Sequence, residues 1–205
     1  MFISFEGIDF CGKSTQVDLL KKYLVDNKKT VKVIREPGGT EISEKIRKLL
    51  LDKDNQGMLM ETEFLLFSSS RAQLVGEKIQ PYLERGIYVI SDRFHDSSTA
   101  YQGYGRGIPV EIVKNIHKLA IGDTLPNITF FIDIPVETAE NRRILKEINQ
   151  LDRIEKSNRD FYNRVRNGYL TMAENEKRFN VIDGTKSIEV IHNKIVEEIG
   201  KIDER

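Results

Sequence analysis

One eight-residue stretch near the start of the chain constrains the fold more than any other part of the sequence. Residues 7–14, Gly-Ile-Asp-Phe-Cys-Gly-Lys-Ser, match the phosphate-binding pattern G-x-x-x-x-G-K-[ST] without a mismatch. Apolar residues before the stretch predict a short buried strand, and apolar residues at helical spacing from Val17 to Leu24 predict a helix after it. The order strand, glycine loop, helix is the context in which this pattern binds phosphate, and the alternative is a chance match in an ordinary turn.

The chemistry of this loop suits a nucleotide. Glycines allow successive N–H groups to point inward, the following helix adds its positive end, and Lys13 adds a full charge. Ser14 has a hydroxyl in position to ligate a magnesium ion that bridges two phosphates. We therefore expect ATP and Mg²⁺ to bind here. The expected nucleotide-binding residues are Gly7, Ile8, Asp9, Phe10, Cys11, Gly12, Lys13, Ser14 and Thr15.

Length and composition narrow the class of protein. The 205 residues suffice for one compact domain, which we expect to span residues 1–205. The chain has 32 Lys and Arg residues together and 32 Asp and Glu residues together. The net charge is therefore zero, and no overall charge favours nucleic acid or a membrane surface as a partner. A single cysteine excludes an internal disulfide framework, and no apolar run resembles a signal peptide or a membrane span. We expect a cytoplasmic protein.

Strand and helix signals alternate along the whole chain. Strands are expected near residues 2–5, 30–35, 87–91, 128–134 and 179–182. Helices are expected near residues 13–24, 40–50, 60–84, 109–121, 136–145, 158–177 and 188–199. Between residues 146 and 156 the periodicity lapses, which predicts a mobile connection. This alternation is typical of an α/β fold with a parallel sheet covered by helices on both faces.

Several arginines follow expected strands or lie in the irregular connection. Arg35 and Arg93 come at strand ends, where open α/β sheets bind ligands, and Arg142 and Arg153 lie further along the chain. For Asp92 and Arg93 the alternative is a strand-end salt bridge. No general base for a sugar hydroxyl is evident. A phosphate acceptor, whose second pKa is about 6, needs no base, so these cations indicate a nucleoside monophosphate as acceptor.

Six motifs resemble those of bacterial thymidylate kinases, in that family's order and spacing and over nearly the whole chain. The resemblance implies the P-loop NTPase three-layer sandwich with strand order 2-3-1-4-5, a lid at about 142–156, and transfer of the γ-phosphoryl of ATP to dTMP. It also implies a homodimer. The motifs are Phe5-Glu6-Gly7-x-Asp9, Arg35-Glu36-Pro37-Gly38-Gly39-Thr40, Leu66-Phe67-Ser68-x-Ser70-Arg71, Asp92-Arg93-Phe94, Asp96-Ser97-Ser98-x-Ala100-Tyr101-Gln102-Gly103 and Asp152-Arg153-x-Glu155.

The resemblance assigns the residues that bind the acceptor base and sugar. Phe67 would stack on the pyrimidine and Arg71 would donate to thymine O4, an arrangement that their four-residue spacing on one helix allows. Ser98 and Gln102 would complete recognition of the base edge, with the Gln102 amide accepting from N3–H and donating to O4. Tyr101 would pack against the sugar. Taken singly, Phe67 could be a core residue and Arg71 a solvated helix charge.

The same resemblance assigns the phosphate and metal ligands. Arg35 and Arg93 would clamp the acceptor phosphate, Asp9 would help to place the acceptor, and Asp92 would act near the metal together with Ser14. The expected catalytic residues are Lys13, Asp9, Asp92, Arg93, Arg142 and Arg153.

The chain departs from the family at Phe10. Family members carry an arginine there, or a glycine together with a catalytic arginine in the lid, and phenylalanine cannot stabilise the migrating charge. We therefore expect the lid to supply the cation from Arg142, Arg153 or both, with Arg143 a weaker candidate. Cys11 is also unusual, and could be a reactive thiol beside a helix N-terminus or simply a small residue.

Two other functions stay open at this point. The first is a kinase for another pyrimidine monophosphate, because thymidylate and deoxyuridylate differ by one methyl group, worth only about 1–3 kcal/mol. The second, from another class, is a nucleotide-binding switch or regulator that hydrolyses ATP slowly without an acceptor.

Overall fold

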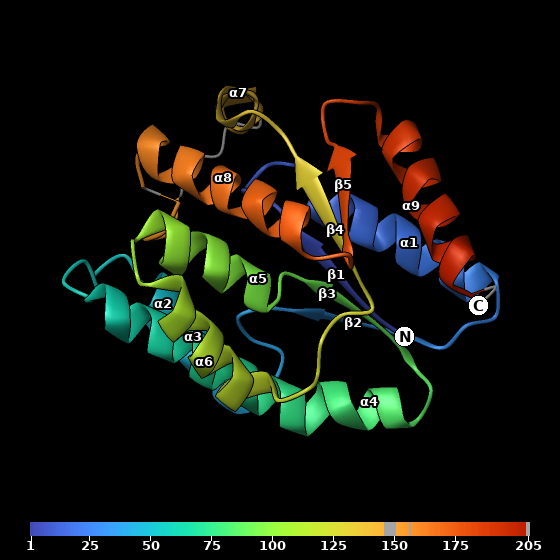
Figure 1. The fold of residues 1–205 in the computed structure, drawn as a ribbon, viewed down its shortest axis with the longest axis horizontal. Coiled ribbons are helices and arrows are strands. Elements are labelled where there is room, and N and C mark those ends of the chain that lie inside the picture. Colours follow the sequence, from blue (N-terminus) through green and yellow to red (C-terminus); the bar gives the residue numbers. More distant parts are fainter. Residues whose placement is uncertain (146–150, 156, 204–205) are drawn as a thin grey trace.

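The computed structural model of the chain describes residues 1–145, 151–155 and 157–203. Its centre is a five-stranded sheet in the order β2-β3-β1-β4-β5, in which all neighbouring strands run parallel (Figure 1). This is the expected fold and strand order. The strands are β1 (Phe2–Glu6), β2 (Val31–Arg35), β3 (Tyr88–Asp92), β4 (Ile128–Asp133) and β5 (Phe179–Asp183).

Helices cover both faces of the sheet (Figure 1). One face carries α1 (Lys13–Asp26) and α9 (Ile188–Asp203), which pack against each other. The opposite layer contains α3 (Met60–Leu74), α4 (Gln80–Glu84), α5 (His95–Ser98) and α8 (Arg159–Asn175). Outside α3 lie α2 (Glu41–Leu51) and α6 (Val110–Ile121), and α7 (Val136–Leu145) precedes α8.

The burial of the strands follows their place in the sheet. All five residues of the central strand β1 are buried, because helices cover both of its faces. The edge strand β2 buries only Ile34. Parallel pairing brings Arg35 of β2 level with Asp92 of β3, and Asp92 level with Phe5 of β1. The strand ends that carry charge therefore share one edge of the sheet.

Two helical segments contain π-helical turns, one of them within the helix expected at 60–84. The expected helix at 60–84 is continuous, but residues Val75–Ile79 (η1) are π-helical. Pro81 explains this widening, because proline has no N–H to donate and clashes with the carbonyl four residues earlier. The short polar helix near Ser98 continues as a second π-helix, η2 (Thr99–Gly105). This π-helix carries Tyr101 and Gln102.

The expected lid at 142–156 lies only partly within the described residues, since positions 146–150 and 156 lie outside them. Residues 142–145 form the end of α7. Within 151–155 the Asp152 carboxylate caps a turn by accepting from the N–H groups of Ile154 and Glu155, both at 2.8 Å. No helix in the described part of the chain is long and apolar enough to cross a bilayer.

Candidate active site

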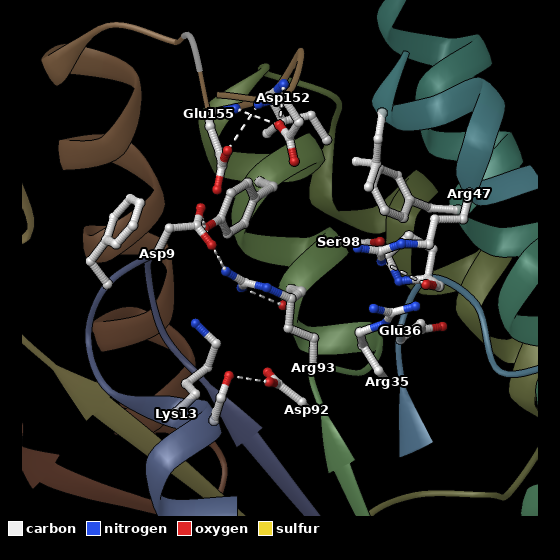
Figure 2. A pocket seen from close by; sticks show the side chains of 18 of the residues that line it. Asp9, Lys13, Arg35, Glu36, Arg47, Asp92, Arg93, Ser98, Asp152 and Glu155 are labelled. Carbon is white, nitrogen blue, oxygen red and sulfur yellow. Dashed lines mark hydrogen bonds and ion pairs between the residues drawn. The ribbon is translucent and has the colours of Figure 1, made fainter. Parts of the chain in front are cut away.

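A cavity of about 390 Å³ opens at the carboxyl edge of the sheet. The phosphate-binding loop forms one side, and residues from β2, α2, α3 and the α5–η2 segment form the other. Figure 2 shows Lys13 and Asp9 on the loop side, Arg35, Glu36 and Arg47 across from them, and Arg93 between the two groups. The cavity therefore has two halves with different chemistry.

The loop half has the backbone geometry that phosphate binding requires. Gly7 has φ +140°, and a Cβ added to it would lie 2.6 Å from the carbonyl oxygen of Ile132. Only glycine fits there. The ammonium of Lys13 folds back over the loop and donates to the carbonyls of Gly7 and Ile8, both at 3.0 Å. This places a cation at the mouth of the loop, at the N-terminus of α1.

The residues expected to hold magnesium are together. Ser14 Oγ donates to Asp92 Oδ2 at 2.9 Å across the entrance of the loop. A hydroxyl and a carboxylate are hard oxygen ligands and fit Mg²⁺. The described residues contain no cluster of three or more His, Cys, Asp or Glu that could hold a metal alone.

Arg93 is the central cation of the cavity (Figure 2). Its guanidinium donates to Asp9 Oδ1 at 2.5 Å, to the Tyr101 hydroxyl at 3.1 Å and to the Gly7 carbonyl at 2.8 Å. Its backbone φ of +72° is rare for a residue other than glycine, and the Ser91 hydroxyl donates to its carbonyl. Burial raises the pKa of Asp9, but the nearby charges of Arg93 and Lys13 outweigh burial and lower it. The family resemblance assigned Asp9, Tyr101 and Arg93 to one ligand, and the structure places them together.

A buried carboxylate that the sequence analysis left without a role supports Arg93 from behind. Glu6, at the end of β1, is fully buried and accepts from the Phe94 N–H at 2.7 Å, the Ser97 hydroxyl at 2.6 Å and the Tyr169 hydroxyl at 2.9 Å. Ser97 Oγ in turn accepts from Arg93 at 3.1 Å. Burial, with a smaller contribution from the charge of Asp96, raises the pKa of Glu6 to about 7.

The wall opposite the loop contains the residues expected to read a base. Arg71 is 1% exposed, so it is not a solvated helix charge. Its Nε lies 2.6 Å from Glu36 Oε1 and its Nη2 donates to Ser98 Oγ at 3.0 Å. Its Nη1 is buried and has no hydrogen-bond partner among the described residues. Phe67 packs in the core and also lines the cavity.

Two further arginines face the same cavity. Arg35 is exposed and lies 3.4 Å from Glu44 Oε1. Arg47, for which no role was predicted, lines the cavity and donates to the Pro37 carbonyl at 2.8 Å. With Arg93, they place three guanidinium groups around the acceptor side of the loop.

The structure does not bring the two expected lid cations into the cavity. Arg142 donates to the carbonyls of Phe10 at 3.3 Å, Cys11 at 3.2 Å and Gly184 at 2.8 Å, so it braces the outer side of the loop. Arg153 turns the other way and lies 2.7 Å from Glu63 Oε2. A role for either in phosphoryl transfer stays a prediction.

Some of the remaining residues of the phosphate-binding loop line the cavity, and others are buried beneath the loop. Ile8 and Cys11 are 2% and 1% exposed and do not line the cavity, so the Cys11 thiol fills space under the loop. Asp9, Phe10, Gly12, Ser14 and Thr15 line it.

Several acidic residues of the site were not predicted from the sequence. Glu63, Asp152 and Glu155 were given no role, yet Asp152 and Glu155 line the cavity and Glu63 lies buried directly behind it. For Glu63 a signal existed, because it shares a helical face with Phe67 and Arg71, four and eight positions later. A carboxylate on a buried helix face is expected to hold a polar partner.

The phosphate-binding loop lies between a strand and a helix, and a hydroxyl and a carboxylate that suit magnesium lie beside it. A second group of cations surrounds the same cavity. Together these features define the class of protein as a kinase that transfers phosphoryl groups between two small ligands. Comparison with known proteins narrows this class. The family model for thymidylate kinase matches residues 5–195. The chain belongs to the thymidylate kinase family.

Relatives and a solved structure agree with this placement. The chain is 49% identical over 199 residues to the thymidylate kinase of Kosmotoga olearia, covering 97% of this chain and 94% of the relative. It is 51% identical over 195 residues to that of Thermosipho africanus, covering 95% of each. The crystal structure of thymidylate kinase from Ehrlichia chaffeensis superposes with a TM-score of 0.78 at 36% identity, covering 98% of both chains.

Proposed function

We propose that this chain is a transferase that moves the γ-phosphoryl group of ATP to dTMP, giving dTDP and ADP for nucleotide biosynthesis. The single observation that carries the proposal is one cavity with a phosphate loop on one side and Arg71, Phe67 and Arg93 on the other. Family membership at about 50% identity over nearly the full length supports the same reaction.

The loop half of the cavity suits the donor. Backbone N–H groups at the start of α1 and the Lys13 ammonium would hold the triphosphate. These groups would contact phosphate oxygens and not the base of the donor nucleotide. Ser14 and Asp92 would hold Mg²⁺, which would supply neutralisation of the charge on the phosphates. Arg142, bonded to two loop carbonyls, would keep the loop in shape while the donor binds.

The opposite half suits a pyrimidine deoxynucleoside monophosphate. Arg93, Arg35 and Arg47 would clamp the acceptor phosphate, while Asp9 and Tyr101, which share Arg93 as a partner, would place the sugar. The acceptor phosphate is ionised at neutral pH, so the protein needs to supply only orientation and positive charge. The Asp9 carboxylate beside Arg93 is paired with that guanidinium and is not a free base.

The experiment is a substrate panel. Purified chain with ATP and Mg²⁺ would be given dTMP, dUMP, dCMP and dGMP in turn, and ADP release and the diphosphate product would be measured. We expect turnover with dTMP and weaker turnover with dUMP. Highest activity with another pyrimidine monophosphate would instead support the first alternative, and ATP hydrolysis that ignores every acceptor would support a switch.

We also propose a homodimer and a cytoplasmic location. An apolar groove runs between α3 and α6, and Leu65 and Ile112 on its walls are 51% and 52% exposed. A second copy of the chain would cover these side chains, since monomers rarely leave such patches open. Light scattering of the native chain and of Leu65→Glu would test this, with a mass of two chains expected only for the native protein. Cell fractionation would test the location.

A further inference from the structure

The Gln102 amide is held in one orientation by a carboxylate outside the cavity. Its Nε2 donates to Glu63 Oε1 at 2.9 Å, and both side chains are at most 2% exposed. An ionised carboxylate can only accept hydrogen bonds, so it must face the amide nitrogen and not the amide oxygen. No described residue donates to Gln102 Oε1. The oxygen is therefore the end of the amide that is left for a ligand in the cavity that Gln102 lines.

Glu63 is kept in its accepting form by its other neighbours. Arg106 donates to both of its oxygens at 3.3 Å, and Arg153 lies 2.7 Å from Oε2. Burial raises the pKa of Glu63, but the charges of Arg106 and Arg153 and the bond from Gln102 outweigh burial and lower it. The carboxylate is ionised at neutral pH and cannot donate to Gln102.

The cavity wall consequently offers one donor and one acceptor to the edge of a base. The donor is Arg71, whose buried Nη1 has no partner among the described residues. The acceptor is Gln102 Oε1. A uracil-type ring, including thymine, presents the complement, a carbonyl oxygen at position 4 beside the N3–H donor. Cytosine presents an amino donor at position 4 beside an N3 acceptor, so both of its contacts would be mismatched.

We propose that Glu63 is a specificity-determining positioning residue: by fixing the Gln102 amide, it makes the cavity accept uracil-type bases and reject cytosine. This inference rests on the proposed function and deepens it. It also refines the expectation that Gln102 donates to O4, because its nitrogen faces Glu63 and the donation falls to Arg71.

The variant Glu63→Gln should reverse the direction of the hydrogen bond between residues 63 and 102. Its new amide would turn its oxygen toward Arg153 and Nη2 of Arg106, which are obligate donors, and its nitrogen toward Gln102, where the bond from Nε of Arg106 would be lost. Gln102 would then accept from residue 63 and present its own nitrogen to the cavity. That nitrogen suits N3 of cytosine and opposes N3–H of thymine.

The test compares kcat/KM for dTMP and dCMP in one coupled assay with ATP and Mg²⁺. In the native chain we expect dTMP to be favoured by at least about 1000-fold, since a site built to hydrogen-bond one group rejects the analogue lacking it. In Glu63→Gln we expect the ratio of dTMP to dCMP to fall at least about tenfold. The Gln102 nitrogen would then match N3 of cytosine, which relieves a mismatch with dCMP, and would oppose N3–H of thymine, which creates a mismatch with dTMP. The ratio is informative because general damage to the site lowers both rates together.

Two controls separate this effect from simple disturbance. Arg106→Gln removes one of the two arginines that keep Glu63 ionised but leaves Arg153 at 2.7 Å and the carboxylate facing Gln102, so the ratio should change much less than in Glu63→Gln. Glu77→Gln makes the same substitution at an exposed position of η1, the π-helical segment after α3, and should change nothing. If Glu63→Gln fails to fold, the double variant with Arg106→Gln keeps the net charge of the cluster and is measured in its place.

The outcomes are distinct. Failure of the native chain to phosphorylate dTMP would count against the proposed function alone. With dTMP turnover established, an unchanged dTMP to dCMP ratio in the folded variant would overturn the role of Glu63. A ratio that falls equally in Arg106→Gln would also overturn it, because the effect would then come from the cluster as a whole.

Discussion

Replacing Glu6 with glutamine should remove a pH-dependent loss of stability that this carboxylate imposes on the folded chain. In the folded state Glu6 titrates at about 7, against 4.5 for an ordinary glutamate, because it is fully buried. Between these values the folded chain holds a proton that the unfolded chain has released. Stability from this group therefore falls as pH rises through that window.

The size of the effect follows from the shift. A difference of about 2.5 pKa units corresponds to about 3 kcal/mol once the group is ionised in both states, of which about 2 kcal/mol develops between pH 5 and pH 8. Glutamine has the shape of the protonated acid and can still accept from the Phe94 N–H while donating to the Ser97 hydroxyl.

The assay is urea unfolding of both proteins at pH 5 and pH 8. Other titrating groups, including Glu36, whose pKa burial raises to about 7 in spite of Arg71, are common to both proteins and cancel in the comparison. We expect Glu6→Gln to gain about 2 kcal/mol on the native chain between pH 5 and pH 8. Equal pH dependence in the two proteins would refute the reasoning, because the native carboxylate would then not be the source of the loss.

Three further substitutions test the cavity directly. Lys13→Ala should lower kcat by about 100-fold or more, because it removes the full charge at the loop, and a kcat within threefold of native would contradict the assignment. Arg71→Lys keeps the charge beside Glu36 but loses the planar fork, so KM for dTMP should rise about tenfold while KM for ATP stays constant, as steady-state kinetics would show. Asp92→Asn should raise the Mg²⁺ concentration needed for half-maximal rate, and an unchanged magnesium titration would remove Asp92 from the metal site.

Regular features of the fold were predictable because they depend on local pattern. The strands and helices follow apolar spacing, and the phosphate loop follows a motif whose glycines are required by geometry, as the 2.6 Å approach at Gly7 illustrates. The strand order came from family resemblance and is confirmed. The π-helical turns were not predicted, because over a few residues they move the backbone hydrogen bonds from four to five positions apart, and no residue pattern in the sequence marks that change.

The partners of charged side chains were the part that sequence could not give. Arg71, Arg93 and Arg153 are all arginines beside an expected site, yet their acceptors lie 35, 84 and 90 positions away in the chain, at Glu36, Asp9 and Glu63. Which carboxylate meets which guanidinium depends on packing of separate elements. The lid cation expected from Phe10, Arg142 or Arg153 or both, stays a prediction, and the pairing of Arg153 with Glu63 was not foreseen.

Three glutamates, Glu6, Glu36 and Glu63, support the cavity from inside the core, at 0%, 3% and 1% exposure. Glu36 and Glu63 contact Arg71 and Gln102 directly, and Glu6 reaches Arg93 through the Ser97 hydroxyl. The same side chains therefore affect both the stability of the fold and the preference for one acceptor over another. A directed-evolution library randomised at these positions would lose most members to misfolding before any changed preference became visible. Engineers seeking new acceptors would gain more by first raising stability elsewhere, and then altering these acids in charge-balanced pairs.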